Sequence, residues 1–216
     1  MTLIGMISKM SEGLGRTCAI FFLTLLFSLP LGLVVALLRM SKSKVLQAVT
    51  RVYISILRGT PLMLQLIAVA YGPFYLFGYT LLVKQKLLAI IIAFALNYAA
   101  YFAEIYRGGI LSVPKGQYEA GKVLGFTKAQ TFVRIILPQV VKKILPAMGN
   151  EVITLVKDTA LVQVLGVAEL FHVAQTQSGR LVSVMPLFIA GVFYFMMNWA
   201  VSRFFDFAEA RLGYYD

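Results

Sequence analysis

Residues 18–38 read CAIFFLTLLFSLPLGLVVALL, an apolar stretch without a single charged side chain. A helix needs about 20 such residues to cross the hydrocarbon layer of a bilayer. Pro30 lies inside the stretch, but a membrane helix tolerates proline where neighbouring helices satisfy the carbonyl that it frees. The stretch is long for the apolar part of a secretion signal and shows no small-residue cleavage pattern. We therefore predict a membrane-spanning helix at 18–38.

The composition of the whole chain extends this prediction. Of 216 residues, 60% are hydrophobic and 13% are charged, whereas a soluble domain carries roughly 25% charged residues. The mean hydropathy is +0.83. Further apolar regions at roughly 62–78, 87–104, 144–168 and 181–203 predict four more spans. The expected fold is an all-α integral membrane protein, a single transmembrane domain over residues 1–216 with five spans.

The basic residues predict the orientation, because Lys and Arg are retained in cytoplasmic loops. Twelve of them lie in the connections between spans one and two and between spans three and four: Arg39, Lys42, Lys44, Arg51, Arg58, Arg107, Lys115, Lys122, Lys128, Arg134, Lys142 and Lys143. Five lie on the other side: Lys9, Arg16, Lys84, Lys86 and Arg180. We expect an outside N-terminus and a cytoplasmic C-terminus.

The net charge of +11 has the same origin. We expect no nucleic-acid partner, because no basic stripe with interleaved stacking aromatics is present. Cys18 is the only cysteine and His172 the only histidine, so no disulfide, metal site or cofactor is expected in this chain. Cys18 is assigned to packing.

The segment after the first span has apolar residues at helical spacing, with Arg51 and Arg58 at its polar positions. It predicts an amphipathic helix at the membrane interface. Gly59-Thr60-Pro61 then interrupts the helix, and we expect Thr60 at the N-cap and Pro61 at the first position of the next one.

The loop at 108–143 is too polar to cross the membrane and has the pattern of a short helix ended by Gly125. It carries Glu119-Ala120, then Gly125 four residues after Gly121, then Ile135-x-Leu137-Pro138 after nine more residues. This spacing resembles the EAA motif of the permease subunits of binding-protein-dependent ABC importers. Arg58-Gly59-Thr60-Pro61, Gly149-Asn150-Glu151 and residues 157–162 (KDTALV) resemble segments of the polar amino-acid branch of that family.

The resemblance implies ATP-driven amino-acid import across the cytoplasmic membrane of a bacterium. It also implies that residues 115–138 contain a coupling helix that docks an ABC ATPase subunit, through Glu119, Ala120, Gly121, Leu124 and Gly125. The other implied partners are an extracellular solute-binding protein and a second permease subunit, the same or homologous. Gly121 replaces the second alanine of the motif, which costs the helix up to about 1 kcal/mol.

The chain itself is not expected to be an enzyme. It contains no G-x-x-x-x-G-K-[ST] phosphate-binding loop, so ATP-Mg is expected in the partner ATPase. No nucleophile with an assignable base is present either, which disfavours a membrane enzyme.

Ionisable and polar residues within the spans are candidates for the substrate path, because they are costly in a membrane. Helical spacing places two sets each on one face: Asn97, Tyr101 and Glu104 on the third span, and Glu151, Thr154 and Asp158 on the fourth. Such faces could bind a zwitterion. Alternatively, Glu104 pairs with Arg107 at i, i+3, and Glu151 and Asp158 are structural. Lys157 points elsewhere, toward another carboxylate or a subunit interface.

A different function remains open at this stage. An ion-gradient-driven transporter or a channel subunit could use Glu104, Glu151 and Asp158 as relay groups. That function leaves the EAA-like loop unexplained.

Overall fold

The computed structural model describes residues 3–212, with side chains from residue 5. All regular elements in this range are helical, as predicted. They are α1 (Leu3–Arg39), α2 (Lys44–Gly59), α3 (Leu62–Phe77), α4 (Val83–Leu111), α5 (Lys115–Val123), α6 (Lys128–Thr131), a π-helix η1 (Phe132–Ile136), α7 (Leu137–Asp158), a 3-10 helix η2 (Thr159–Leu165), α8 (Leu170–Leu181) and α9 (Met185–Leu212).

Within the described residues, three helices are long and apolar enough to cross a bilayer: Gly5–Arg39 of α1, α4 and α9. The pair α2 and α3, bent by 103°, makes a fourth candidate. The apolar region at 144–168 is shared between α7 and η2, and the region at 181–203 starts at the end of α8. The number of five spans therefore stays a prediction.

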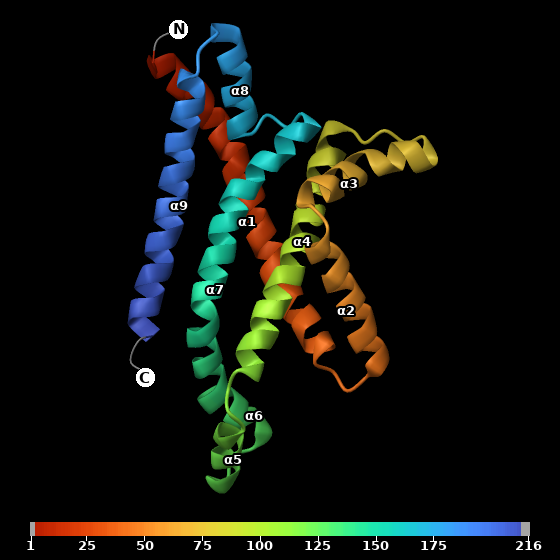
Figure 1. Cartoon of the computed structure of the whole chain (residues 1–216), viewed down its shortest axis with the longest axis vertical. Coiled ribbons are helices and arrows are strands. Elements are labelled where there is room, and N and C mark those ends of the chain that lie inside the picture. Colours follow the sequence, from red (N-terminus) through yellow and green to blue (C-terminus); the bar gives the residue numbers. More distant parts are fainter. Residues whose placement is uncertain (1–2, 213–216) are drawn as a thin grey trace.

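The elements lie along one long axis (Figure 1). The start of α1 and helix α8 lie at one end, whereas α5 and α6 lie at the other, toward which α9 runs. This arrangement is consistent with termini on opposite sides of a membrane. Which end faces the cytoplasm remains a prediction from the basic residues.

Helices α1 and α4 pack closely because small residues face the contact. A Cβ atom on Gly32 would lie 2.9 Å from Cβ of Phe102 and 3.1 Å from the carbonyl oxygen of Ala99. Thr24 and Ser28 of α1 are fully buried. The Ser28-x-x-x-Gly32 spacing thus serves helix packing within this chain.

The main apolar core joins α1, α3, α4, α7 and η2. It contains Phe94, Tyr98 and Phe102 of α4, packed with Leu66 of α3 and Leu155 of α7, all at most 1% exposed. This core holds the polar side chains of α4 and α7 in fixed positions.

Helix α2 is amphipathic as predicted, but Val45, Val49, Val52 and Ile56 of its apolar stripe are exposed, and a different side of the helix packs on α1 and α4. Ile54 is buried there, and Tyr53 Oη donates to the carbonyl oxygen of Leu96 over 2.5 Å. The predicted capping at the break is wrong by one residue. Pro61 is the N-cap of α3, and Thr60 caps the end of α2, its hydroxyl donating to the carbonyl oxygen of Ile56.

Candidate functional site

Two predicted site residues, Glu151 and Asp158, lie two turns apart on α7, and Asp158 is its last residue. Tyr98 of α4 donates a hydrogen bond from Oη to Oδ2 of Asp158 over 2.7 Å. Tyr98 is 1% exposed, whereas both carboxylates are half-buried. Helices α4 and α7 therefore meet at this polar position, as the sequence predicts. The residue of α4 that makes the contact is Tyr98, which is not one of the predicted site residues.

Arg58, near the end of α2, supplies a positive charge to the same region. Its guanidinium carbon lies 5.1 Å from the centre of the Tyr101 ring, a cation–π arrangement. Glu151 is within reach of the charges of both Arg58 and Asp158. A cation and two carboxylates thus occur together with two tyrosines. We call Arg58, Tyr98, Tyr101, Glu151 and Asp158 the polar cluster.

Glu104 pairs with Arg107, which is the alternative to a role in the substrate path that the i, i+3 spacing suggests. Arg107 Nε lies 3.1 Å and 3.0 Å from its two carboxylate oxygens, and Nη2 contacts one of them as well. Arg39 Nε lies 4.0 Å from Oε1. Glu104 is therefore occupied by arginines, one helical turn away from Tyr101.

Asn97 and Thr154 make internal hydrogen bonds. The buried Asn97 donates through Nδ2 to the carbonyl oxygen of Leu57 over 3.0 Å and to Oε1 of Gln65 over 2.9 Å, which ties α4 to the break between α2 and α3. The Thr154 hydroxyl donates to the carbonyl oxygen of Asn150. Lys157 is exposed. Asn97 thus has a structural use that the sequence did not reveal.

The EAA-like residues form α5 and the turn that follows it. Val123 is 88% and Leu124 is 67% exposed, and Glu119 and Ala120 are also exposed. Gly125 has φ +73°, which only glycine adopts without strain. Thr127 then caps α6, accepting from the backbone N–H of Gln130. The loop therefore presents an apolar end to its surroundings.

Gly121 is the buried member of the motif. A Cβ atom there would lie 2.5 Å from Cγ2 and 2.6 Å from Oγ1 of Thr131. Thr131 is itself buried, and its hydroxyl donates to the carbonyl oxygen of Thr127. The glycine is thus explained by close contact with α6, because the side chain of Thr131 fills the space that an alanine methyl would need.

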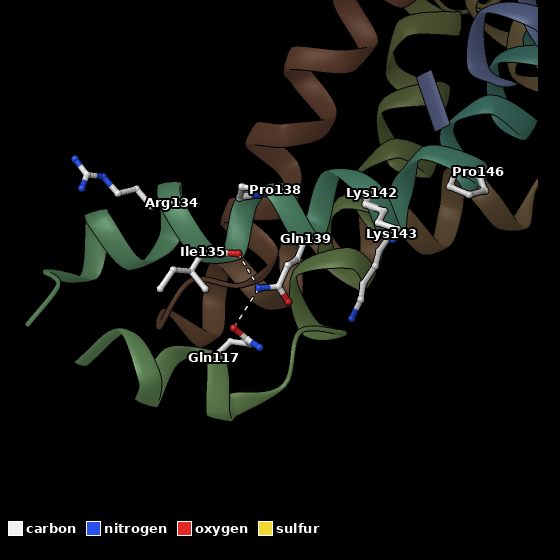
Figure 2. A pocket seen from close by; sticks show the side chains of 8 residues that line it. All are labelled: Gln117, Arg134, Ile135, Pro138, Gln139, Lys142, Lys143 and Pro146. Atoms are coloured by element: carbon white, nitrogen blue, oxygen red, sulfur yellow. Dashed lines mark hydrogen bonds between the residues drawn. The ribbon is translucent and has the colours of Figure 1, made fainter. Parts of the chain in front are cut away.

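Helix α5 is fixed to the start of α7 (Figure 2). Gln139 Nε2 donates to Oε1 of Gln117 over 3.3 Å and to the carbonyl oxygen of Ile135 over 2.8 Å. Tyr118 packs on the buried Ile136 and Val140. A groove of about 800 Å³ beside this contact is lined by Gln117, Arg134, Ile135, Pro138, Gln139, Lys142, Lys143 and Pro146. Helix α5 and the start of α7 are therefore held together by a side-chain hydrogen bond and by packing.

Comparison with known proteins identifies the family. The profile described as "Binding-protein-dependent transport system inner membrane component" matches residues 28–214. The L-cystine transport system permease protein TcyB of Bacillus subtilis is 40% identical over 208 residues, covering 95% of this chain and 87% of TcyB. The chain belongs to this permease family.

Further relatives narrow the class of permease. The arginine transport system permease protein ArtQ of Bacillus subtilis is 36% identical over 187 residues, covering 86% of this chain and 84% of ArtQ. A solved structure described as "Crystal structure of an amino acid ABC transporter with histidines" has 35% identity and a TM-score of 0.86, covering 98% of this chain and 99% of that one. The chain is a membrane permease of an amino-acid ABC importer, as the sequence predicted, and the ion-gradient alternative gains no support.

Sequence reasoning missed two members of the polar cluster of this permease. The sequence pattern places Arg58 on the polar face of an interfacial helix, and Tyr98 lies beside the predicted polar face of the third span. No local pattern connects Tyr98 to Asp158, which lies 60 residues later.

Proposed function

We propose that this permease couples ATP hydrolysis in a separate ABC ATPase subunit to transport through α5. The supporting observation is the pair Val123 and Leu124, which are exposed and apolar at the end of a helix held firmly to α7. An apolar end next to the closely packed Gly121 suits insertion into a groove of another protein. ATP-Mg is held by the partner, in this proposal.

We further propose that substrate passes the polar cluster. An amino acid is a zwitterion, so its ammonium group suits Glu151 and Asp158, and its carboxylate suits Arg58. The excess of carboxylates favours an amino acid with a cationic or neutral polar side chain. Of the residues predicted from the sequence, Tyr101, Glu151 and Asp158 belong to this path, whereas Glu104 lies beside it and Asn97 and Thr154 support it.

A passage needs walls on all sides, and the polar cluster belongs to one bundle of helices. We propose that a second permease subunit, the same or homologous, completes the passage around a two-fold axis. A solute-binding protein delivers the amino acid at the end where α8 lies. The protein resides in the cytoplasmic membrane with α5 on the cytoplasmic side.

The coupling role is tested with Leu124→Asp in the complete transporter. A charge in an apolar contact is expected to lower the amount of ATPase subunit that co-purifies by about tenfold or more. Val182→Asp is the matched control, because Val182 is 94% exposed on the far side of the molecule. Equal recovery of the ATPase with both variants would refute the docking proposal.

The path is tested with Glu151→Gln and Asp158→Asn, which keep shape and remove charge. Uptake of radiolabelled L-cystine, L-arginine and L-glutamine by proteoliposomes identifies the amino acid that is carried. The loss of one charge-assisted contact is expected to weaken its binding about tenfold, whereas Lys157→Gln, on the same helix, is expected to leave binding unchanged. If both carboxylate variants transport as the original does, the path lies elsewhere.

A further inference from the structure

A second group of arginines lines a small pocket that shares Arg58 with the polar cluster. Its volume is about 230 Å³, and it lies between the end of α1, one face of α2, and α4. Arg51, Ser55 and Arg58 follow each other at i, i+4 and i+7 on α2 and so share a helical face. The complete lining is Arg39, Arg51, Ile54, Ser55, Arg58 and Glu104.

The positive charges of this pocket exceed the negative charge that could balance them. Glu104 is the only acidic residue in the lining, and Arg107 already contacts both of its carboxylate oxygens. Among the described residues, ion pairs of Glu104 are made with Arg107 and, at 4.0 Å, with Arg39. Arg51 and Arg58 make no ion pair within 4.0 Å in the described part of the chain, although the charge of Glu151 reaches Arg58.

One donor in the pocket is buried and unused. Arg39 Nε has no hydrogen-bond partner within the described residues, although its side chain is only 19% exposed. An unpaired buried donor is costly, and more so when it is charged. A guanidinium fork matches the oxygens of a carboxylate or phosphate, and the Ser55 hydroxyl adds a neutral donor. The pocket thus has the chemistry of an anion-binding site.

We propose that this pocket binds an oxyanion, and that its occupant during transport is the carboxylate of the amino acid. The carboxylate is favoured because Arg58 belongs both to this pocket and to the polar cluster. The guanidinium of Arg58 can therefore hold the carboxylate while it moves from the polar cluster to the pocket. The identity of this occupant rests on the proposed substrate path, whereas the oxyanion site itself does not. The phosphate of an anionic lipid is the other source of the same chemistry.

The oxyanion site is tested first with inorganic phosphate as the probe. The melting temperature of the purified permease–ATPase complex is measured in phosphatidylcholine nanodiscs against phosphate concentration at constant ionic strength. Phosphate stabilises many folded proteins without binding to a site. The readout is therefore the difference between variants in how the melting temperature depends on phosphate concentration. Arg51→Gln is expected to weaken the apparent phosphate affinity about tenfold. Lys44→Gln, on the same helix but outside the pocket lining, is the control.

The source of the oxyanion is then decided with two further probes. The amino acid found in the uptake assay is compared with its α-carboxamide, and phosphatidylglycerol nanodiscs are compared with phosphatidylcholine ones. The proposal predicts that Arg51→Gln weakens binding of the free amino acid about tenfold and leaves binding of the amide unchanged. A stabilisation by phosphatidylglycerol that requires Arg51, without any preference for the free acid, would overturn the assignment to the amino acid.

The two proposals fail differently. Equal responses of the original protein, Arg51→Gln and Lys44→Gln to phosphate would overturn the oxyanion site. If Glu151→Gln and Asp158→Asn leave uptake unchanged while the Arg51-dependent phosphate response persists, the substrate path is wrong and the anion site stands.

Discussion

Tyr98 of α4 donates a hydrogen bond to Asp158, the last residue of α7, over 2.7 Å. The two residues are 60 positions apart, and the bond lies at the centre of the polar cluster. It joins α4 to the end of α7, and the start of the same helix α7 contacts α5 through Gln139.

Tyr98→Phe removes this bond and leaves Asp158 without its partner. A hydrogen bond to a charged group contributes about 1.5–3 kcal/mol, so we expect a lower melting temperature of the complex and slower uptake. Tyr106→Phe is the control, because Tyr106 lies on the same helix and its side chain makes no hydrogen bond with the described residues. Identical melting and uptake for the two variants would show that the bond is dispensable.

Gly121→Ala is expected to disturb α5 despite the better helix propensity of alanine. The added methyl overlaps Thr131, at a cost of about 1–3 kcal/mol, which exceeds the gain of up to about 1 kcal/mol from propensity. Limited proteolysis of the 115–131 segment and uptake-coupled ATPase activity report the effect. Gly116→Ala is the control on the same helix, since nothing lies within 4 Å of its added Cβ.

Thr131→Ala should rescue Gly121→Ala, because it removes both atoms that lie closest to the new methyl, Cγ2 and Oγ1. The remaining Cβ of residue 131 lies 3.1 Å away and needs only a small shift. The double variant is expected to recover protease resistance and coupling relative to Gly121→Ala. A double variant that is worse than either single one would contradict the packing explanation.

Gly32→Ala is expected to separate α1 from α4, because its Cβ would lie 2.9 Å from Cβ of Phe102, which is part of a packed helix. We expect destabilisation of about 1–3 kcal/mol, seen as a lower melting temperature in detergent. Gly15→Ala on α1 has no atom within 4 Å of the added Cβ and should be neutral or slightly stabilising. A neutral Gly32→Ala would mean that the helices adjust freely.

Glu169, at the N-cap of α8, gives a pH dependence at the end of the bundle where α8 lies. Its carboxylate accepts from the backbone N–H groups of Phe171 and His172 and from Tyr194 Oη. Burial raises the pKa of Glu169, and these hydrogen bonds only partly oppose the shift. A raised folded-state pKa means a contribution to stability that is full below the ordinary glutamate pKa, about 4.3, and is lost as the pH rises through the folded value.

We therefore expect the original protein to lose stability relative to Glu169→Gln as the pH is raised from about 4.5 to about 7.5. Melting temperatures of both proteins across this range provide the measurement. Glu12→Gln removes an exposed carboxylate from the same end of the molecule and should parallel the original protein. Parallel curves for Glu169→Gln and the original would contradict a shifted Glu169.

Some contacts could be predicted from the sequence because they are local. The Glu104–Arg107 pair is one helical turn long, and its spacing made it a stated alternative. The sequence predicts that Gly125 ends a short helix, and Gly125 follows the C-cap of α5 with a positive φ. The predicted N-cap of α3 is wrong by one residue. The Thr60 hydroxyl can cap the helix that follows it or donate to a carbonyl of the helix that precedes it, and in the structure it donates to Ile56.

The sequence by itself determined the helical membrane fold, the permease family and the place of the EAA-like loop, because apolar length, helical period and motif spacing are properties of neighbouring residues. Only the tertiary structure decided that Tyr98 meets Asp158, that Arg58 joins them and that Thr131 fills the space beside Gly121. These contacts depend on how separate helices pack, and helix packing is set by the summed shape of many side chains rather than by any one motif.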